Sequence, residues 1–126
     1  MNFVKGELVG TNGEVKFASQ DITLRIPKDF QEYVRHAVGG KVTMGIRPVD
    51  IYESPALDGE SSEIQCKVDF RELMGSETFL YLRVGKTPLI ARASATTDAH
   101  AGSTVPLHVN LRCIHFYDEV SQTAIL

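Results

Sequence analysis

Gly39-Gly40-Lys41 is the segment of this sequence that comes nearest to phosphate-binding chemistry. A P-loop has a glycine, four further residues, Gly-Lys, and then a Ser or Thr whose hydroxyl holds Mg²⁺. Here Arg35 stands where the first glycine is required, and Val42 follows the lysine. The segment therefore predicts the end of a helix, where glycine supplies a left-handed backbone, and not a nucleotide site.

Cys66, Cys113 and His115 are residue types that bind zinc. Cys113 and His115 would share one face of a strand, and Cys66 could approach them across a sheet. Zinc sites use three or four ligands at recognisable spacing, so this trio favours a core thiol beside a partly buried imidazole. Neither cysteine lies in a Cys-x-x-Cys motif, and we expect two buried, reduced thiols and no metal.

Gly75-Ser76-Glu77-Thr78 is the most specific local feature of the chain. Glycine allows a tight turn, and the two hydroxyls can satisfy backbone donors while Glu77 is held at an exposed tip. This pattern predicts the apex of a hairpin. The functional alternative is a surface contact for another subunit or a regulator.

Phe70, Phe79, Tyr81 and Phe116 could form a platform on which the bases of a single-stranded nucleic acid stack. We expect no basic residues on the same face as these aromatic residues. Plain packing in the core is therefore the favoured interpretation.

Length and charge limit the function further. The chain has 126 residues, the usual size of one domain, and a formal net charge of −3. It lacks the basic field that non-specific nucleic-acid binding requires, and no apolar run approaches the roughly 20 residues that cross a bilayer. The start of the chain lacks the apolar stretch of a signal peptide, so we expect a cytoplasmic protein without nucleic-acid binding or membrane insertion.

Short alternating stretches predict strands along most of the chain. Asn12-Gly13 between two such stretches predicts a tight hairpin, because both residues accept positive φ. One helix is expected, capped by Asp29, with apolar residues at helical spacing up to Val38 and a stop at Gly39-Gly40. Many strands and one short helix indicate an all-β barrel or sandwich.

The composition shifts to Pro, Gly, Ser and acidic residues between residues 53 and 62. Residues 54–62 are therefore the best linker candidate. The whole chain, 1–126, is expected to be one domain, with possible small β lobes at 1–53 and 63–126 that share strands.

Four segments resemble, in their order, a known family: Met1-Asn2-Phe3, Val42-Thr43-Met44-Gly45-Ile46-Arg47-Pro48, Met74-Gly75-Ser76-Glu77-Thr78 and Ile114-His115-Phe116-Tyr117-Asp118. The chain looks like the C-terminal regulatory domain of the ATP-binding subunits of carbohydrate-uptake ABC transporters, of the maltose and glycerol-phosphate importer type. The resemblance implies an OB-like β-barrel of the transport-associated (TOBE, molybdate-binding-like) kind.

The resemblance also implies a function. Such a domain pairs with its twin, so a homodimer is expected, and it offers a docking surface to regulatory proteins. ATP and Mg²⁺ would be bound by an absent ATPase domain, which would contact the membrane subunits at the inner face of the membrane. The chain itself is expected to have no cofactor and no catalytic residue.

The resemblance directs attention to Arg47, Gly75-Ser76-Glu77 and His115-Phe116 as contacts for the twin or a regulator. Pro48 fixes an extended exit after Arg47, which holds the guanidinium at a strand end where it can pair with an acid and brace the lobe junction. An exposed Phe116 would bury a large area in a two-fold interface. The main alternative is a barrel that binds a small oxyanion such as molybdate or sulfate through Ser76, Thr78 and backbone N–H groups.

Overall fold

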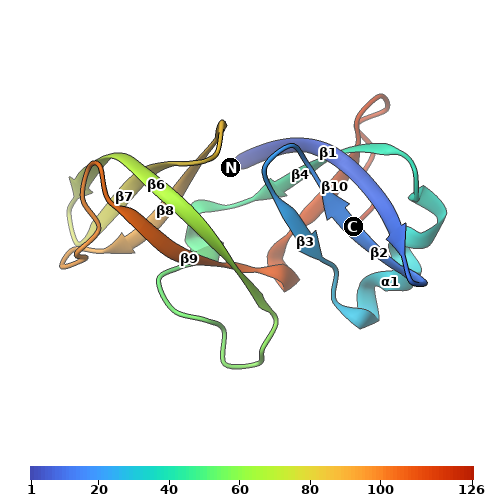
Figure 1. Ribbon diagram of the computed structural model, residues 1–126, viewed down its shortest axis with the longest axis horizontal. Helices are drawn as coiled ribbons and strands as arrows, with labels where there is room; N and C mark the ends of the chain where they lie inside the picture. Colours follow the sequence, from blue (N-terminus) through green and yellow to red (C-terminus); the bar gives the residue numbers. More distant parts are fainter.

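The computed structural model describes residues 1–126 and consists mainly of ten strands in two curled antiparallel sheets, which lie side by side along the long axis (Figure 1). The first sheet has the order β10-β4-β1-β2-β3, and the second has the order β5-β9-β6-β7-β8. The strands are β1 Asn2–Thr11, β2 Glu14–Ala18, β3 Thr23–Arg25, β4 Lys41–Ile46, β5 Ile51–Tyr52, β6 Ser61–Met74, β7 Glu77–Val84, β8 Thr87–Ser94, β9 Thr104–Asn110 and β10 His115–Asp118. This confirms an all-β, OB-like architecture.

Turn chemistry builds the first hairpin as expected. Asn12 and Gly13 both have positive φ, 51° and 81°, and connect β1 to β2 with Thr11 paired to Glu14. Positive φ at both central positions matches the right-handed twist of the flanking strands. The prediction of a tight Asn-Gly hairpin is confirmed.

The expected helix is much shorter than its apolar spacing indicates. Only α1, Gln31–Val34, is α-helical, and the 3₁₀ turns Lys28–Phe30 and Arg35–Ala37 flank it. Asp29 makes no capping bond. Val34 is buried, and Phe30 and Ala37 pack partly against the core, but Tyr33 and Val38 are 54% and 45% exposed. Only part of the apolar spacing therefore packs, and the regular helix stays short.

Gln31 is the buried polar residue of α1. Its side-chain oxygen accepts the N–H of Val15 at 2.8 Å, and its side-chain nitrogen donates to the carbonyls of Val15 and Ile26 at 3.0 and 3.1 Å. The buried side-chain amide thus supplies hydrogen-bond partners to backbone groups of β2 and of the residue after β3 that no neighbouring strand reaches. It fixes α1 to the end of the first sheet.

The chain order does not divide the lobes in the expected way. Residues 54–60 form the loop at the lower centre of Figure 1, but they connect β5 to β6 within the second sheet, and β6 already begins at Ser61. The chain crosses between the sheets earlier, at residues 47–50. The structure differs from the expected lobe 63–126 because β10 returns to the first sheet, where it pairs with β4. No strand belongs to both sheets.

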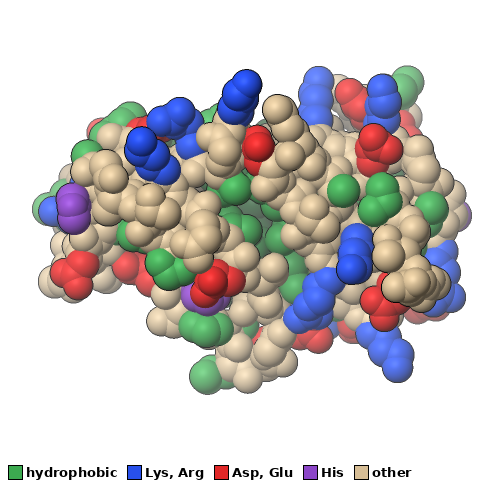
Figure 2. All heavy atoms as spheres, viewed as in Figure 1, with side chains coloured by type: hydrophobic (Ala, Val, Ile, Leu, Met, Phe, Trp, Pro, Cys, Tyr) green, Lys and Arg blue, Asp and Glu red, His purple; other side chains and the backbone are tan.

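One hydrophobic core of 26 buried residues extends through both sheets. Phe17 of β2 and Phe116 of β10 lie within it, with ring centroids 5.5 Å apart. In the face shown in Figure 2, hydrophobic side chains gather near the middle, where the sheets meet, and charged side chains surround them. The shared core makes the two sheets one packed unit.

No helix in the structure has the length and apolar character needed to span a membrane.

Candidate functional site

Arg47 lies where the chain crosses from the first sheet to the second. It follows β4 and precedes the 3₁₀ turn Pro48–Asp50, which leads directly into β5. Its Nε donates to Oδ2 of Asp50 at 2.9 Å, and the N–H of Asp50 donates to the Arg47 carbonyl at 3.0 Å. Asp50 is buried while Arg47 is largely exposed, so one face of the guanidinium is fixed and the rest faces solvent.

Cys113 lies beside this crossover. It ends the 3₁₀ turn Leu111–Cys113 and is half-buried, so it does not share a strand face with His115. Burial, followed by the carboxylate of Asp50, raises the pKa of the Cys113 thiol. Cys66 is fully buried, and burial raises its pKa to about 12. No group of three or more His, Cys, Asp or Glu residues is arranged to hold a metal ion.

The turn Gly75-Ser76 forms the predicted hairpin apex between β6 and β7. Gly75 has φ +64°, and Met74 pairs with Glu77 across the turn. Gly75 and Ser76 are exposed, but Thr78 is only 2% exposed and points inward. Ser76 and Thr78 therefore do not converge on one oxyanion.

The outer side of β6, β7 and β8 carries an apolar surface that we call the hairpin face. Cross-strand partners share a face of a sheet, and the register places Phe70 beside Tyr81 and Ile90, Glu72 beside Phe79 and Arg92, and Met74 beside Glu77. The hairpin face consists of the apolar residues Phe70, Met74, Phe79, Tyr81 and Ile90 and the charged residues Glu72, Glu77 and Arg92.

Two aromatic rings stand out on the hairpin face. Phe70 is 52% exposed and stacks on Tyr81, with centroids 4.3 Å apart and an interplanar angle of 12°. Met74 is 55% exposed. A guanidinium nitrogen of Arg92 lies 3.4 Å from a carboxylate oxygen of Glu77, which forms an ion pair beside these rings. The expectation that Phe70, Phe79 and Tyr81 pack in the core is wrong, because the bulge after Val68 and the pairing register turn these rings outward.

Phe116 corrects a second expectation. Its side chain is 1% exposed and packs in the core, so it cannot supply an exposed ring to a partner. The cause is the pairing of β10 with β4, in which Phe116 lies opposite the buried Met44. His115 and Tyr117 alternate with Phe116 and lie on the outer side of the first sheet; His115 is exposed.

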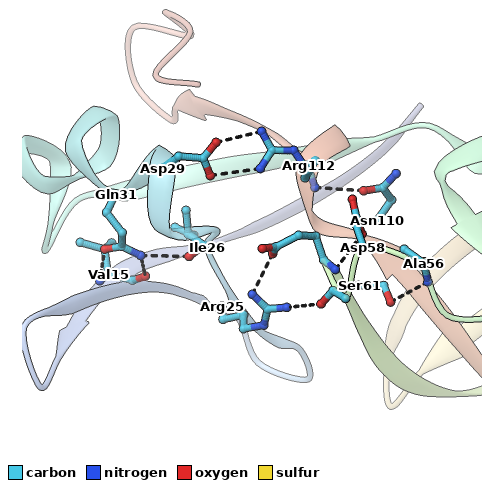
Figure 3. A network of polar contacts seen from close by, with 12 residues as sticks. Val15, Arg25, Ile26, Asp29, Gln31, Ala56, Asp58, Ser61, Asn110 and Arg112 are labelled. Carbon is cyan, nitrogen blue, oxygen red and sulfur yellow. Dashed lines mark hydrogen bonds and ion pairs between the residues drawn. The ribbon is translucent and has the colours of Figure 1, made fainter.

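Ion pairs join the two lobes at one end of their junction, and no pattern in the sequence indicates them. Arg112 lies in the 3₁₀ turn that follows β9 of the second sheet. Its guanidinium donates two hydrogen bonds of 3.0 and 2.9 Å to the carboxylate of Asp29 (Figure 3). Arg25 of β3 bonds Glu60 at 2.9 Å and the carbonyl of Gly59 at 2.7 Å. These contacts link residues up to 83 positions apart, which local patterns do not reveal.

The edge strand β8 is tied to the first lobe at two further points. The side chain of Asn2 accepts the N–H of Ile90 at 2.7 Å and donates to the Ile90 carbonyl at 2.8 Å. The carboxylate of Asp21 accepts the Lys86 N–H at 3.1 Å and the Thr87 hydroxyl at 2.9 Å. Because these groups satisfy an open edge, β8 is protected from pairing with other strands along this part.

The fold defines an OB-like β domain, in which the P-loop-like segment Gly39-Gly40-Lys41 leads into β4. Two family models match the chain: the MalK OB fold domain over residues 1–51 and the TOBE domain over residues 44–116. The chain belongs to the TOBE domain family. The expected resemblance to ABC transporter ATP-binding subunits is confirmed.

The similar proteins are ABC transporter ATP-binding proteins. The chain is 33% identical over 127 residues to YcjV of Escherichia coli K12, covering 99% of the chain and 33% of that protein. It is 31% identical to the oligosaccharides import ATP-binding protein MsmX of Bacillus subtilis, over 99% of the chain and 34% of MsmX. A shorter match, 37% over 83 residues, covers 64% of the chain and 22% of the multiple sugar-binding transport ATP-binding protein MsmK of Streptococcus mutans. The chain thus spans about one third of the length of the first two relatives.

Proposed function

We propose that this chain is the non-catalytic regulatory and dimerisation domain of an ATP-binding subunit of an ABC importer, used for carbohydrate uptake. ATP and Mg²⁺ are bound by a separate domain of the longer protein, which contacts the membrane subunits at the cytoplasmic face. The family and the sugar-import names of MsmX and MsmK support this proposal. The observation that carries the dimerisation role is the apolar hairpin face.

Apolar area on the hairpin face favours burial against another protein. Phe70 and Met74, 52% and 55% exposed, both lie on the hairpin face, with Met74 next to the turn. Exposed apolar clusters rimmed by polar residues mark protein-interaction sites. Aromatic residues are also enriched at the centres of such sites.

Charge on the hairpin face favours a second copy of this chain as the partner. A two-fold interface brings the same patch together from both subunits, so the patch must be complementary to itself. Glu72 and Arg92 flank Phe79 in one cross-strand row. In a two-fold pairing, Glu72 of one copy can lie opposite Arg92 of the other copy, and the reverse.

The other predicted contact residues have narrower roles in this proposal. Gly75 and Ser76 shape the tip that borders the hairpin face, and Glu77 positions Arg92. Arg47 and His115 lie away from the hairpin face, on the crossover and on the first sheet, and are available to a regulatory protein.

Sedimentation over a series of concentrations tests this proposal. The wild-type chain should rise from its monomer mass of 13.9 kDa toward twice that value as its concentration approaches about 1 mM. Phe70→Asp should remain monomeric, because it replaces the stacked ring by a carboxylate, whose charge opposes burial in an interface. Phe3→Asp is the matched control, since Phe3 is also exposed, at 63%, but lies on the other sheet.

A wild-type chain that stays monomeric throughout would contradict the dimerisation role. Equal dimerisation of Phe70→Asp and the wild type would show that another surface is used. Circular dichroism of both variants establishes that they remain folded.

A further inference from the structure

The outer side of the first sheet carries a hollow of about 430 Å³ that the dimerisation role does not use. This volume lies in the range of small-molecule sites. Its walls come from three adjacent strands, in which Lys5 of β1, Thr43 of β4 and Tyr117 of β10 form one cross-strand row. The remaining lining includes Phe3 of β1 and the loop residues Glu119 and Gln122.

Gly45 allows the aromatic side chains to come together beside this row. It lies between Phe3 and His115 in the next cross-strand row. A Cβ at Gly45 would lie 3.0 Å from Met1 Sδ, 3.3 Å from Tyr117 Cε2 and 3.4 Å from Phe3 Cε1. The rings of Phe3 and Tyr117 therefore flank a position that only glycine leaves open.

The polar wall of the hollow is held in place before any ligand arrives. Oδ1 of Asp118 accepts the N–H groups of Val120 and Ser121 at 3.0 and 2.9 Å. The N–H of Gln122 donates to the Asp118 carbonyl at 2.8 Å, and Gln122 has a φ of 59°. A left-handed backbone at a residue other than glycine is uncommon and often accompanies function.

The charges around the hollow select among ligands. Asp118 and Glu119 supply two carboxylates against the single ammonium of Lys5, which lies 3.8 Å from Glu119. The two bonds from backbone N–H groups lower the pKa of Asp118, so it is ionised at neutral pH. A surplus of carboxylates disfavours phosphate, sulfate and molybdate in this hollow.

We propose that the hollow binds a neutral sugar, with a ring face against Tyr117 and Phe3 and its hydroxyl groups bonded to Glu119, Gln122 and Lys5. Carboxylates accept from hydroxyl groups, ammonium donates to them, and the glutamine amide does both. Aromatic rings offer apolar area of matching size. OB folds elsewhere bind oligosaccharides on strand faces and adjoining loops.

This site is separate from the hairpin face, since it lies on the other sheet and shares no residue with it. The sugar proposal and the dimerisation proposal can therefore fail independently. Such an open hollow predicts weak binding, with a Kd of about 1 mM.

Nuclear magnetic resonance of the ¹⁵N-labelled 126-residue chain tests the sugar proposal. Glucose, maltose, sucrose and raffinose are titrated separately, with sodium sulfate and AMP as competing ligand classes. A sugar should shift the amide signals of Thr43, Tyr117 and Glu119 in a saturable way. Tyr117→Ala and Glu119→Gln should each weaken its binding at least about tenfold. Tyr33→Ala is the control and should leave it unchanged, because Tyr33 is an exposed tyrosine of α1 outside both the hollow and the hairpin face.

Three outcomes overturn the proposal: no sugar shifts these signals, the shifts persist in Tyr117→Ala, or only sulfate or AMP binds there. Glu119→Gln keeps the shape of the side chain, so a lost response in this variant with an otherwise unchanged spectrum reports the binding contact and not the fold.

Discussion

Arg112 and Asp29 face each other across the junction of the two sheets, joined by parallel hydrogen bonds of 3.0 and 2.9 Å. The Arg112 guanidinium also lies 4.7 Å from the centroid of the Phe30 ring. A bidentate pair fixes orientation as well as distance. Since Phe30 and Asp29 belong to the first lobe and Arg112 follows the last strand of the second sheet, this contact sets how the lobes meet.

Replacing Arg112 should change the titration of Asp29. The hydrogen bonds from Arg112 are the largest cause of the lowered pKa of Asp29 in the folded chain. A lowered folded-state pKa stabilises the fold above the unfolded value, roughly 4, and this contribution is lost as pH falls through the folded pKa. In Arg112→Ala, ¹³C-detected titration should therefore find the pKa of Asp29 raised, and urea unfolding should lose part of its dependence on acid pH. An unchanged Asp29 pKa would contradict the pairing.

Gln31→Ala should destabilise the chain by about 1 to 3 kcal/mol, because it leaves buried backbone groups without partners. The affected groups are the N–H and carbonyl of Val15 and the carbonyl of Ile26. Urea unfolding measures this change. Gln65→Ala is the control, since Gln65 is exposed, and it should change stability by less than about 0.5 kcal/mol. Equal effects would show that Gln31 is not an anchor.

Gly85→Ala should cost more stability than Gly102→Ala. Both glycines have positive φ, +60° and +87°, so alanine strains the backbone at each. At Gly85 the added Cβ would also lie 2.6 Å from Asp21 Cγ, whereas nothing lies within 4 Å at Gly102. Overpacking of this kind adds about 1 to 3 kcal/mol. Thermal unfolding of the two variants compares them, and the same Tm for both would mean that Asp21 does not hold the β7–β8 turn.

Alkylation should distinguish the two thiols. Cys66 is fully buried, and its pKa is raised to about 12. Cys113 is only half-buried, so a reagent in solution can reach its thiol. Iodoacetamide at mildly alkaline pH should modify Cys113 first, more slowly than a free cysteine, because its pKa is also raised. Peptide mass spectrometry identifies the modified residue. Modification of Cys66 before Cys113 in the folded chain would contradict this burial.

Local chemistry predicted the strands and turns well. Asn12-Gly13 and Gly75-Ser76 form hairpin turns through their own backbone preferences, so these turns depend little on residues distant in the sequence. The helix prediction overestimated the length of α1, because helical spacing at Tyr33 and Val38 has no apolar surface to pack against. That information lies in tertiary structure and not in the segment.

The surfaces were harder to predict than the elements. Whether Phe70 or Phe116 is exposed depends on the bulge after Val68 and on the return of β10 to β4. The hollow near Tyr117 likewise needs β1, β4 and β10 side by side, which chain order alone does not show. The alternation of residue types within His115-Phe116-Tyr117 does indicate that Phe116 faces the opposite side of the strand from His115 and Tyr117.

The most direct test of the central claim is the concentration dependence of the ¹H–¹⁵N spectrum of the wild-type chain, from dilute solution to about 1 mM. Pairing through the hairpin face predicts progressive shifts confined to β6, β7 and β8, centred on Phe70, Phe79 and Arg92. An unchanging spectrum, or shifts centred on Tyr117 or Arg47 instead, would contradict it.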